Sequence, residues 1–523
     1  MTKRFWHAAI AAALTGALAT PATAAWFEAR SDHFVIYAPG SADTARDYAT
    51  RLERFDKGLR VMRGLPERPS DRANPLYVYV LPDAASIERL CGSGGNRKES
   101  TCRNVAGFYQ PRAGGSVAFT PRRSGNGGQF ELNAQTVLFH EYTHHFMYAN
   151  YTAAYPGWFT EGFAEFNGTA RSERDGGLGF GIPAMHRGYS LMNGGKPLTL
   201  EELLTADSRK LNQDEREALY GRGWLLTHYL TFERKRDGQL STYLRELNRG
   251  KPSLEAAKIA FGDLKILDRD VERYLLSAKM PYLPIAKDKL PIGEVTIRPL
   301  SPGETAMMPV RMRSERGVNA TTATAVVAQA RTLAAPYAAD PVVQAWLAEA
   351  EYDARQDDRA EAAADRALAV DPKSREALLY KGRVHMRRAV QAKATDQAVW
   401  REARSWFVKA NRLEPDDAEP LMLFYDSFRP SGQRPSANAI IGLNQAFALA
   451  PQDAGLRFRV AREYIRDGKR NEAKLVLAPL AYDPHRGPDS PAAKLIASLD
   501  SADEAAIRTA SDAADAQDDS DSE

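Results

Sequence analysis

The sequence predicts an α+β region toward the N-terminus, followed by an all-α region of helical repeats. Short β-branched and aromatic runs before residue 121 predict strands, whereas the patterns from 134 to about 276 are helical. After residue 340, prolines recur at the ends of helix-like segments, at intervals typical of a repeat. The chain has 523 residues, of which 44% are hydrophobic, enough for about three globular domains.

Residues 1–24 have the features of a signal peptide. Lys3 and Arg4 precede the apolar stretch 8–19, and Ala22-Thr23-Ala24 is a small-residue cleavage site. The apolar stretch is shorter than the roughly 18 residues that a membrane-spanning helix needs. We therefore expect an exported protein, periplasmic or secreted, with no transmembrane segment in the mature chain.

The charge and cysteine counts narrow the class further. Lys and Arg number 70 against 67 Asp and Glu, a formal net charge of +3, whereas a dedicated nucleic-acid binder has a strong basic excess. We expect no nucleic-acid partner. Cys91 and Cys102 are the two cysteines, and in an oxidising compartment we expect them to form a disulfide that closes a Gly- and Ser-rich loop.

The region 25–280 is expected to be one domain with strands first and helices later. Its first elements are strand 33–37, helix 43–62, strand 76–81, and hairpin strands 105–110 and 116–120 around Gly114-Gly115. The following region, 281–320, is richer in proline and less regular. We interpret it as a connector with strands.

The region 321–498 has a repeating rhythm. Prolines at 341, 372, 415, 451 and 484 are spaced by 31, 43, 36 and 33 residues, and each after the first closes an Ala- and Leu-rich helical segment. This pattern resembles the tetratricopeptide repeat, a helical hairpin of 34 residues. The longest interval predicts an insertion near 391–400. An irregular helical bundle is the alternative, and 499–523 is expected to be an acidic disordered tail.

The most informative motif is His140-Glu141-x-x-His144. On a helix, side chains four residues apart project from the same face, about 5–6 Å apart at Cβ. Two such imidazoles can ligate one Zn²⁺, with the glutamate beside the attacking water as general base. The apolar residues around the motif predict a buried helix.

A second segment lies shortly downstream. Pro156-Gly157 and Asn167-Gly168 bound a short predicted helix, which places Glu161 and Glu165 one turn apart on the same face. An isolated pair would be ordinary exposed carboxylates. The apolar surroundings and the nearby histidines favour a functional role instead, because a hydrolytic zinc site usually takes three protein ligands.

The two motifs together, H-E-Y-T-H and W-F-T-E-G-F-A-E-F, resemble the gluzincin metallopeptidases, the superfamily of thermolysin and aminopeptidase N. Within it they are similar to the bacterial peptidase MA-like family, which is often fused to tetratricopeptide repeats. The resemblance covers about 26–276 and implies a thermolysin-like domain with a small mixed sheet and a helical subdomain. It implies one Zn²⁺ per chain, held by His140, His144 and Glu161, with Glu141 as general base.

The resemblance also implies supporting residues. Glu165 matches an acidic residue that hydrogen-bonds the first zinc histidine. Tyr220 stands at a distance comparable to that of a transition-state-stabilising tyrosine, although it can equally anchor its helix in the core; His228 is a weaker candidate for the same role. Thr160 occupies a position where relatives often carry Asn. His145 lies about 100° round the helix and is expected to be structural.

One departure concerns the kind of peptidase. Aminopeptidases of this superfamily have an upstream Gly-x-Met-Glu-Asn segment whose glutamate holds the substrate amine, but 114–128 contains no carboxylate. We therefore expect an endopeptidase. We also expect the strand at 116–120 to pair with an extended peptide.

These features predict an exported zinc-dependent peptidase that acts on a peptide or protein substrate. Two alternatives stay open. One is a non-catalytic periplasmic tetratricopeptide scaffold with a relic zinc domain, in which a protein partner binds the repeat surface. The other is a zinc amidase that acts on cell-wall material, because the motif does not define the bond that is cleaved.

Overall fold

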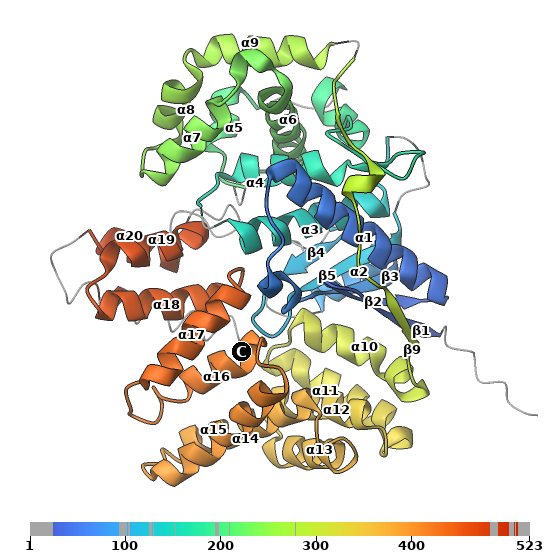
Figure 1. Ribbon diagram of the computed structural model, residues 1–523, viewed down its shortest axis with the longest axis vertical. Coiled ribbons are helices and arrows are strands. Elements are labelled where there is room, and N and C mark those ends of the chain that lie inside the picture. Colours follow the sequence, from blue (N-terminus) through green and yellow to red (C-terminus); the bar gives the residue numbers. More distant parts are fainter. Residues whose placement is uncertain are drawn as a thin grey trace, which may run out of the picture.

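The computed structural model has a sheet-based N-terminal region, a helical region beside it and a long array of paired helices (Figure 1). It describes residues 25–93, 102, 105–124, 128, 130–151, 153–193, 198–208, 210–277, 279–481, 490–500, 507, 509 and 510. The predicted signal peptide and most of the predicted acidic tail lie outside these described residues.

Six of the described strands form one sheet with the order β4-β5-β3-β2-β1-β9. The pairs β2–β3 and β3–β5 are parallel, and the other pairs are antiparallel. The strands are β1 (Trp26–Arg30), β2 (Phe34–Pro39), β3 (Leu76–Asp83), β4 (Phe108–Gln110), β5 (Val117–Arg123) and β9 (Thr296–Pro299). The strands predicted at 33–37 and 76–81 and the predicted hairpin are present. β1 escaped prediction because its sequence, WFEAR, alternates over only four residues and contains no β-branched residue.

Helices cover both faces of this sheet. Alternate side chains of a strand point to opposite faces, so Phe34 and Ile36 of β2 pack into one core while Val35 and Tyr37 pack into another. The first core is closed by α1 (Ala42–Arg63) and α3 (Ala134–Asn150), and the second by α2 (Ala84–Gly92) and α10 (Pro302–Arg316). Helix α3, which carries the histidine motif, therefore lies directly on the sheet.

A helical subdomain follows α3 and occupies the upper part of Figure 1. Its helices are α4 (Gly157–Gly168), α5 (Leu200–Thr205), α6 (Gln213–Phe232), α7 (Gln239–Asn248), α8 (Ser253–Phe261) and α9 (Leu264–Leu275). They share a core in which Trp158 and Trp224 are buried. Beside them, β6 (Arg171–Ser172), β7 (Leu178–Phe180) and β8 (Leu283–Ile285) form a small antiparallel sheet.

The region predicted as a connector with strands contains two strands, and both pair with strands outside it. β8 pairs with β7, and β9 pairs with the outer edge of β1, where Ile297 lies opposite Ala29. The helical array then begins at Pro302, where Ser301 caps α10, and not at 321. The outer edge of β1 would otherwise present unpaired backbone groups, and β9 satisfies them.

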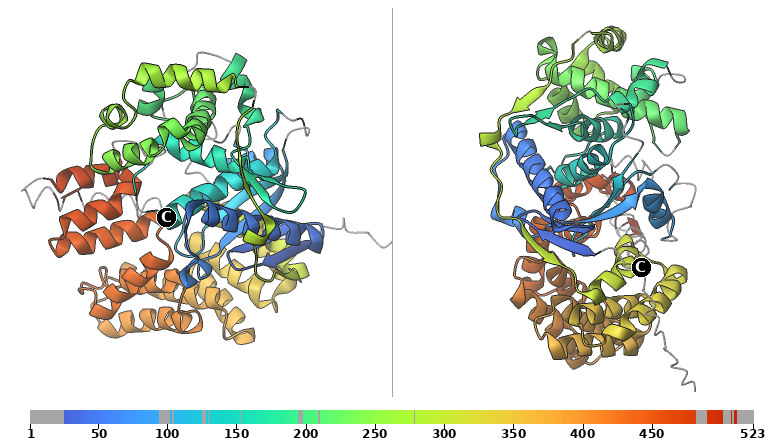
Figure 2. Two further views of the ribbon diagram at one scale, coloured as in Figure 1. Left: turned by 45° about the horizontal axis from the view of Figure 1, so that its top comes forward. Right: turned by 90° about the vertical axis from the view of Figure 1, so that its right-hand side faces the viewer.

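The C-terminal region is a series of helical hairpins, seen from the side in Figure 2. The pairs are α10 with α11 (Ala320–Ala334), α12 (Pro341–Asp353) with α13 (Asp357–Val370), α14 (Arg375–Gln391) with α15 (Gln397–Leu413), α16 (Ala418–Asp426) with α17 (Ala437–Leu449), and α18 (Ala454–Arg466) with α19 (Arg470–Ala481), followed by α20 (Pro491–Ser498). As predicted, the prolines at 372, 415 and 451 each follow the second helix of a hairpin. The long interval arises because α14 and α15 have 17 residues each, against 13 and 14 in α12 and α13.

Two further expectations concern the chain as a whole. Among the described residues, no helix is both long enough and apolar enough to span a bilayer. Cys91, in α2, and Cys102 form a disulfide with their Cα atoms 5.7 Å apart. The Arg316 guanidinium donates to the Cys91 carbonyl from Nε at 2.9 Å, so the disulfide lies against the first repeat helix.

Candidate metal centre

Helix α3 presents both motif histidines on the side that faces away from the sheet core. Asn133 caps its N-terminus by accepting a backbone amide of the first turn. Phe139 stacks on Phe55 of α1, with ring centroids 3.9 Å apart. This packing fixes the rotation of α3, and with it the direction in which His140 and His144 project.

Helix α4 brings Glu161 against those histidines because glycines let it approach its neighbours closely. A Cβ at Gly162 would lie 2.3 Å from the carbonyl oxygen of Gly223, where α4 crosses α6. At the end of α4, a Cβ at Gly168 would lie 3.3 Å from the backbone nitrogen of His140. Larger side chains at these positions would push α4 away from both helices.

The three predicted ligands converge. The Nε2 atoms of His140 and His144 are 3.1 Å apart, and Glu161 Oε2 lies 3.3 Å from the first and 3.6 Å from the second. Donor atoms about 2.0–2.2 Å from a tetrahedral zinc ion stand about 3.3–3.6 Å apart, so this triangle has the size that zinc requires. The Glu161 side chain is buried, but the imidazoles keep 13% and 12% of their side-chain surface exposed, which leaves the cluster reachable.

Glu165 holds His140 from the opposite side. Its Oε1 is 3.2 Å from His140 Nδ1, a contact that orients the ring and turns Nε2 toward the cluster. Burial by itself lowers the pKa of His140. The contacts with Glu161 and Glu165 have the opposite and together larger effect, so that the pKa rises to about 10. The surroundings of the cluster are therefore electronegative and favour a cation.

Two residues that the sequence analysis missed support Glu165. His186 Nε2 is 2.9 Å and Arg187 Nη2 is 2.8 Å from its carboxylate, and Arg187 Nη1 also contacts Glu217 at 2.5 Å. Burial raises the pKa of Glu165, but the charge of Arg187 and the histidine hydrogen bonds hold it well below the usual range. The residues at 186 and 187 lie in a short 3₁₀ helix, Met185–Arg187, whose sequence has no periodicity. The only available signal was that a buried carboxylate needs a cationic partner.

Tyr220, in the first half of α6, faces the cluster. Its ring centroid is 6.0 Å from that of His140, and the Arg187 guanidinium lies 4.7 Å from the ring centroid of Tyr220. The charge of Glu161 raises the pKa of Tyr220 well above its ordinary value, burial adds to the effect, and Glu141 contributes as well. The phenol therefore keeps its proton and can act as a hydrogen-bond donor.

The edge strand beside the cluster is β4. A Cβ at Gly107, just before β4, would lie 2.4 Å from Val137 Cγ1 and 3.5 Å from Glu141 Cγ. The segment predicted to pair with a peptide, 116–120, lies in β5 between β3 and β4. That prediction is wrong, because both backbone edges of β5 are already paired within the sheet.

Three other residues weighed at the sequence level lie in contacts of their own. His145, on the far side of α3, is 3.0 Å from the Tyr109 hydroxyl, and burial lowers its pKa to about 3. The nitrogens of the buried His228 contact a backbone carbonyl and the Tyr274 hydroxyl, each at 2.9 Å. The Thr160 hydroxyl bonds to a carbonyl at the start of its own helix. None of these contacts includes a predicted zinc ligand.

No protein-family model matches the chain, and no curated protein matches it. Among solved structures, the chain is similar to a thermophilic TPR protein of Thermus thermophilus, at 17% identity and a TM-score of 0.30. The alignment covers 40% of this chain and 98% of that protein. The chain combines a sheet-based N-terminal region with a C-terminal array of repeat-like helical hairpins.

Proposed function

We propose that this chain is an exported zinc-dependent peptidase with a thermolysin-like domain of the gluzincin type. The proposal is carried by the convergence of His140, His144 and Glu161, from two separate helices, into a triangle of zinc-ligand size. Two imidazole nitrogens and one carboxylate oxygen are also the donor set of hydrolytic zinc sites. Export rests on the predicted signal peptide.

The residues around the triangle have complementary roles. A zinc ion held there supplies a Lewis acid that polarises a carbonyl and lowers the pKa of water. Glu141 would take the proton of the attacking water and return it to the leaving amine. Tyr220 would donate a hydrogen bond to the oxygen on which negative charge develops. Glu165 would keep the proton on His140 Nδ1, so that Nε2 remains free to ligate.

The proposed substrate is an extended segment of a peptide or protein. The edge strand β4 lies beside Glu141 and has backbone groups of the kind that pair with an added strand. Pairing with β4 would lay the peptide along α3 and across the cluster. This arrangement favours cleavage within a chain and supports the expected endopeptidase.

The test is the Glu141→Gln variant of the mature protein, assayed on casein and on envelope proteins. We expect it to retain zinc and to lose peptidase activity by at least about 100-fold, because general-base catalysis contributes about 10²–10⁴-fold. Glu201→Gln, an exposed position on α5, is the matched control and should cleave at the wild-type rate. Wild-type activity in Glu141→Gln would contradict the assignment.

The second candidate is a non-catalytic scaffold, which the array of repeat-like hairpins favours. It predicts that wild type and Glu141→Gln are equally inactive on every substrate. A zinc amidase that acts on cell-wall material would use the same residues. It would show cleavage of cell-wall amides with no cleavage of casein, so the same substrate panel separates the three functions.

A further inference from the structure

The repeat array faces inward onto the N-terminal sheet. The helices α10, α12, α14 and α16, together with the turn 450–453 before α18, form the surface that we call the inner face. Tyr79 and Phe119 of the sheet share a hydrophobic core with Met307 of α10 and Trp346 of α12. The views agree that the array curves beneath the sheet (Figures 1 and 2).

The turn between β4 and β5 inserts into this inner face. Asp453 Oδ2 accepts from the Ala113 amide at 2.8 Å, and Gln452 Nε2 donates to Ser116 Oγ at 3.1 Å. The Ala113 side chain, 3% exposed, belongs to a core made otherwise by residues from α16 to α18. The turn 111–116 is therefore held by both backbone and side-chain contacts.

Other repeat helices hold the same turn from its other side. Arg112 Nη1 pairs with Glu315 Oε2 of α10 at 2.7 Å. A Cβ at Gly114 would lie 2.6 Å from Glu419 Oε2 of α16, so a larger residue there would displace the end of that side chain. Repeat arrays commonly use such an inward surface to bind an extended ligand, and in this protein the chain fills it with its own turn.

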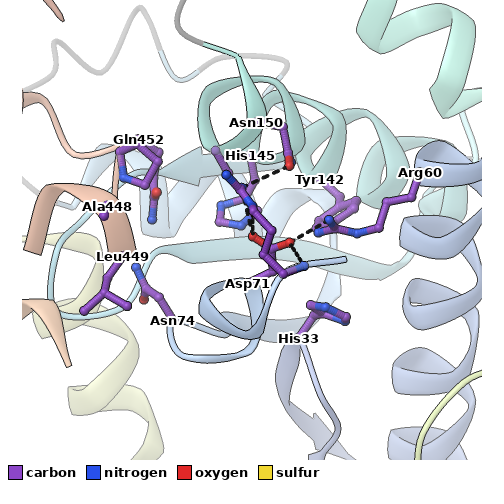
Figure 3. A pocket seen from close by; sticks show the side chains of 13 residues that line it. His33, Arg60, Asp71, Asn74, Tyr142, His145, Asn150, Ala448, Leu449 and Gln452 are labelled. Carbon is purple, nitrogen blue, oxygen red and sulfur yellow. Dashed lines mark hydrogen bonds and ion pairs between the residues drawn. The ribbon is translucent and has the colours of Figure 1, made fainter. Parts of the chain in front are cut away.

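The contacts continue from the turn to helix α3. The Tyr109 hydroxyl of β4 donates to Ser116 Oγ at 3.3 Å and is 3.0 Å from Nδ1 of His145, the neighbour of a predicted zinc ligand. Figure 3 shows the adjoining cavity, where Gln452 and Leu449 lie across from α3. Its volume is about 30 Å³, room for about two waters at 10–15 Å³ each. One hydrogen-bonded path thus joins the repeats, β4 and α3.

We infer that the repeat array positions the substrate-pairing strand. The turn before α18 holds the β4–β5 turn through Gln452 and Asp453, so that the edge of β4 with which no described strand pairs stays in register beside Glu141. Both are positioning residues, because they contact the turn and not the substrate. This inference rests on the proposed function, and it gives the repeats a role within the chain in place of partner recruitment at their inner face.

The test uses Asp453→Asn in the full mature protein. Asp453 Oδ1 caps α18 by accepting the Leu456 amide at 2.7 Å, and asparagine caps as well as aspartate. The substitution therefore leaves the cap but turns an NH₂ donor toward the Ala113 amide. The matched control is Asp396→Asn, which caps α15 through the Ala398 amide. Gln452→Ala is the second variant, should Asp453→Asn fail to fold.

Two readouts decide the outcome. For Asp453→Asn we expect faster amide hydrogen exchange across 108–116 and a KM about tenfold higher, the size of effect that the loss of a hydrogen bond to a charged group gives. Its kcat and zinc content should not change. Asp396→Asn should match wild type in exchange and in KM. Unchanged exchange, or faster exchange with an unchanged KM, would overturn the inference. A wild type that cleaves no peptide overturns the proposed function and with it the substrate role. The exchange comparison then still decides whether the repeats hold the strand.

Discussion

Two groups of buried or half-buried carboxylates in this molecule differ in where their compensating positive charge comes from. In the candidate metal centre, Glu161 meets the nitrogens of His140 and His144 at the spacing of metal ligands. In the second group, which we call the Arg311 cluster, Glu315 and Glu376 each lie 2.6 Å from the Arg311 guanidinium, which also contacts Glu349. In the Arg311 cluster the cation is a side chain of the protein, whereas the candidate metal centre has donor atoms that can bind a cation from solution.

The comparison teaches that acid content alone does not mark a metal site. In the Arg311 cluster, three carboxylates share one guanidinium. Burial raises the pKa of Glu349 most strongly, Arg311 lowers it, and the charges of Glu315 and Glu376 raise it, so that it reaches about 8. The cluster therefore reduces its excess negative charge by keeping Glu349 protonated. In the candidate metal centre, imidazole nitrogens and a second carboxylate orient the donors for an ion instead.

The largest expected effect on the free energy of unfolding comes from replacing Arg311, whose guanidinium is the cation of the Arg311 cluster. Arg311→Met takes the shared guanidinium from buried Glu349 and from half-buried Glu376, while Glu315 keeps only Arg112. Breaking a buried ion pair costs about 3–5 kcal/mol. Denaturant unfolding at pH 8 should show this loss. At pH 5 the loss should be smaller, because the carboxylates can protonate. Stability within about 1 kcal/mol of wild type at pH 8 would mean that the Arg311 cluster is not held by its cation.

The next effect concerns the orientation of a zinc ligand. Glu165→Gln weakens the hold on His140 and leaves Arg187 less well paired, so we expect zinc to bind about 10–100-fold more weakly. Competition with a chelator measures the dissociation constant. Glu201→Gln serves again as the exposed control. Equal zinc affinity in Glu165→Gln and wild type would remove Glu165 from the site.

A smaller effect tests the helix approach that brings Glu161 into place. Gly162→Ala adds a Cβ against the Gly223 carbonyl, and overpacking of this kind costs about 1–3 kcal/mol. At Gly442 of α17, an added Cβ meets only Leu421 at an ordinary 3.5 Å. Gly442→Ala should therefore be neutral or stabilising. If thermal unfolding shows equal effects for both variants, the close approach of α4 and α6 is not required.

The smallest effect is a change of slope with pH. Folded Glu349, which faces Arg311, Glu315, Glu376 and Asp353, keeps its proton up to about pH 8, whereas the unfolded chain releases it near 4.5. The folded state binds more protons between these values, so the stability of wild type falls as pH rises through this window. Glu349→Gln removes that contribution. Its unfolding free energy should exceed that of wild type by about 1 kcal/mol near pH 8.5 and match it near pH 5; an equal difference at both would contradict the raised pKa.

The sequence predicts best what depends on local spacing. The i,i+4 histidines and the glycine-bounded helix of Glu161 are local patterns, and so are the prolines that end the hairpins. Pairing over longer separations escapes prediction: β9 joins β1 across some 270 residues, and β5 lies inside the sheet because β3 pairs in parallel with its other edge. Arg187 also escapes, because its role depends on a buried carboxylate that only the fold brings to it.

Metal analysis of the purified mature protein, beside its Glu161→Ala variant, tests the central claim most directly. After purification with added zinc and removal of excess metal, we predict one zinc ion per chain in wild type. In the variant, which keeps both histidines but loses the carboxylate from α4, zinc should fall to a small fraction of that value. A wild type without zinc, or a variant that holds as much as wild type, would contradict the account.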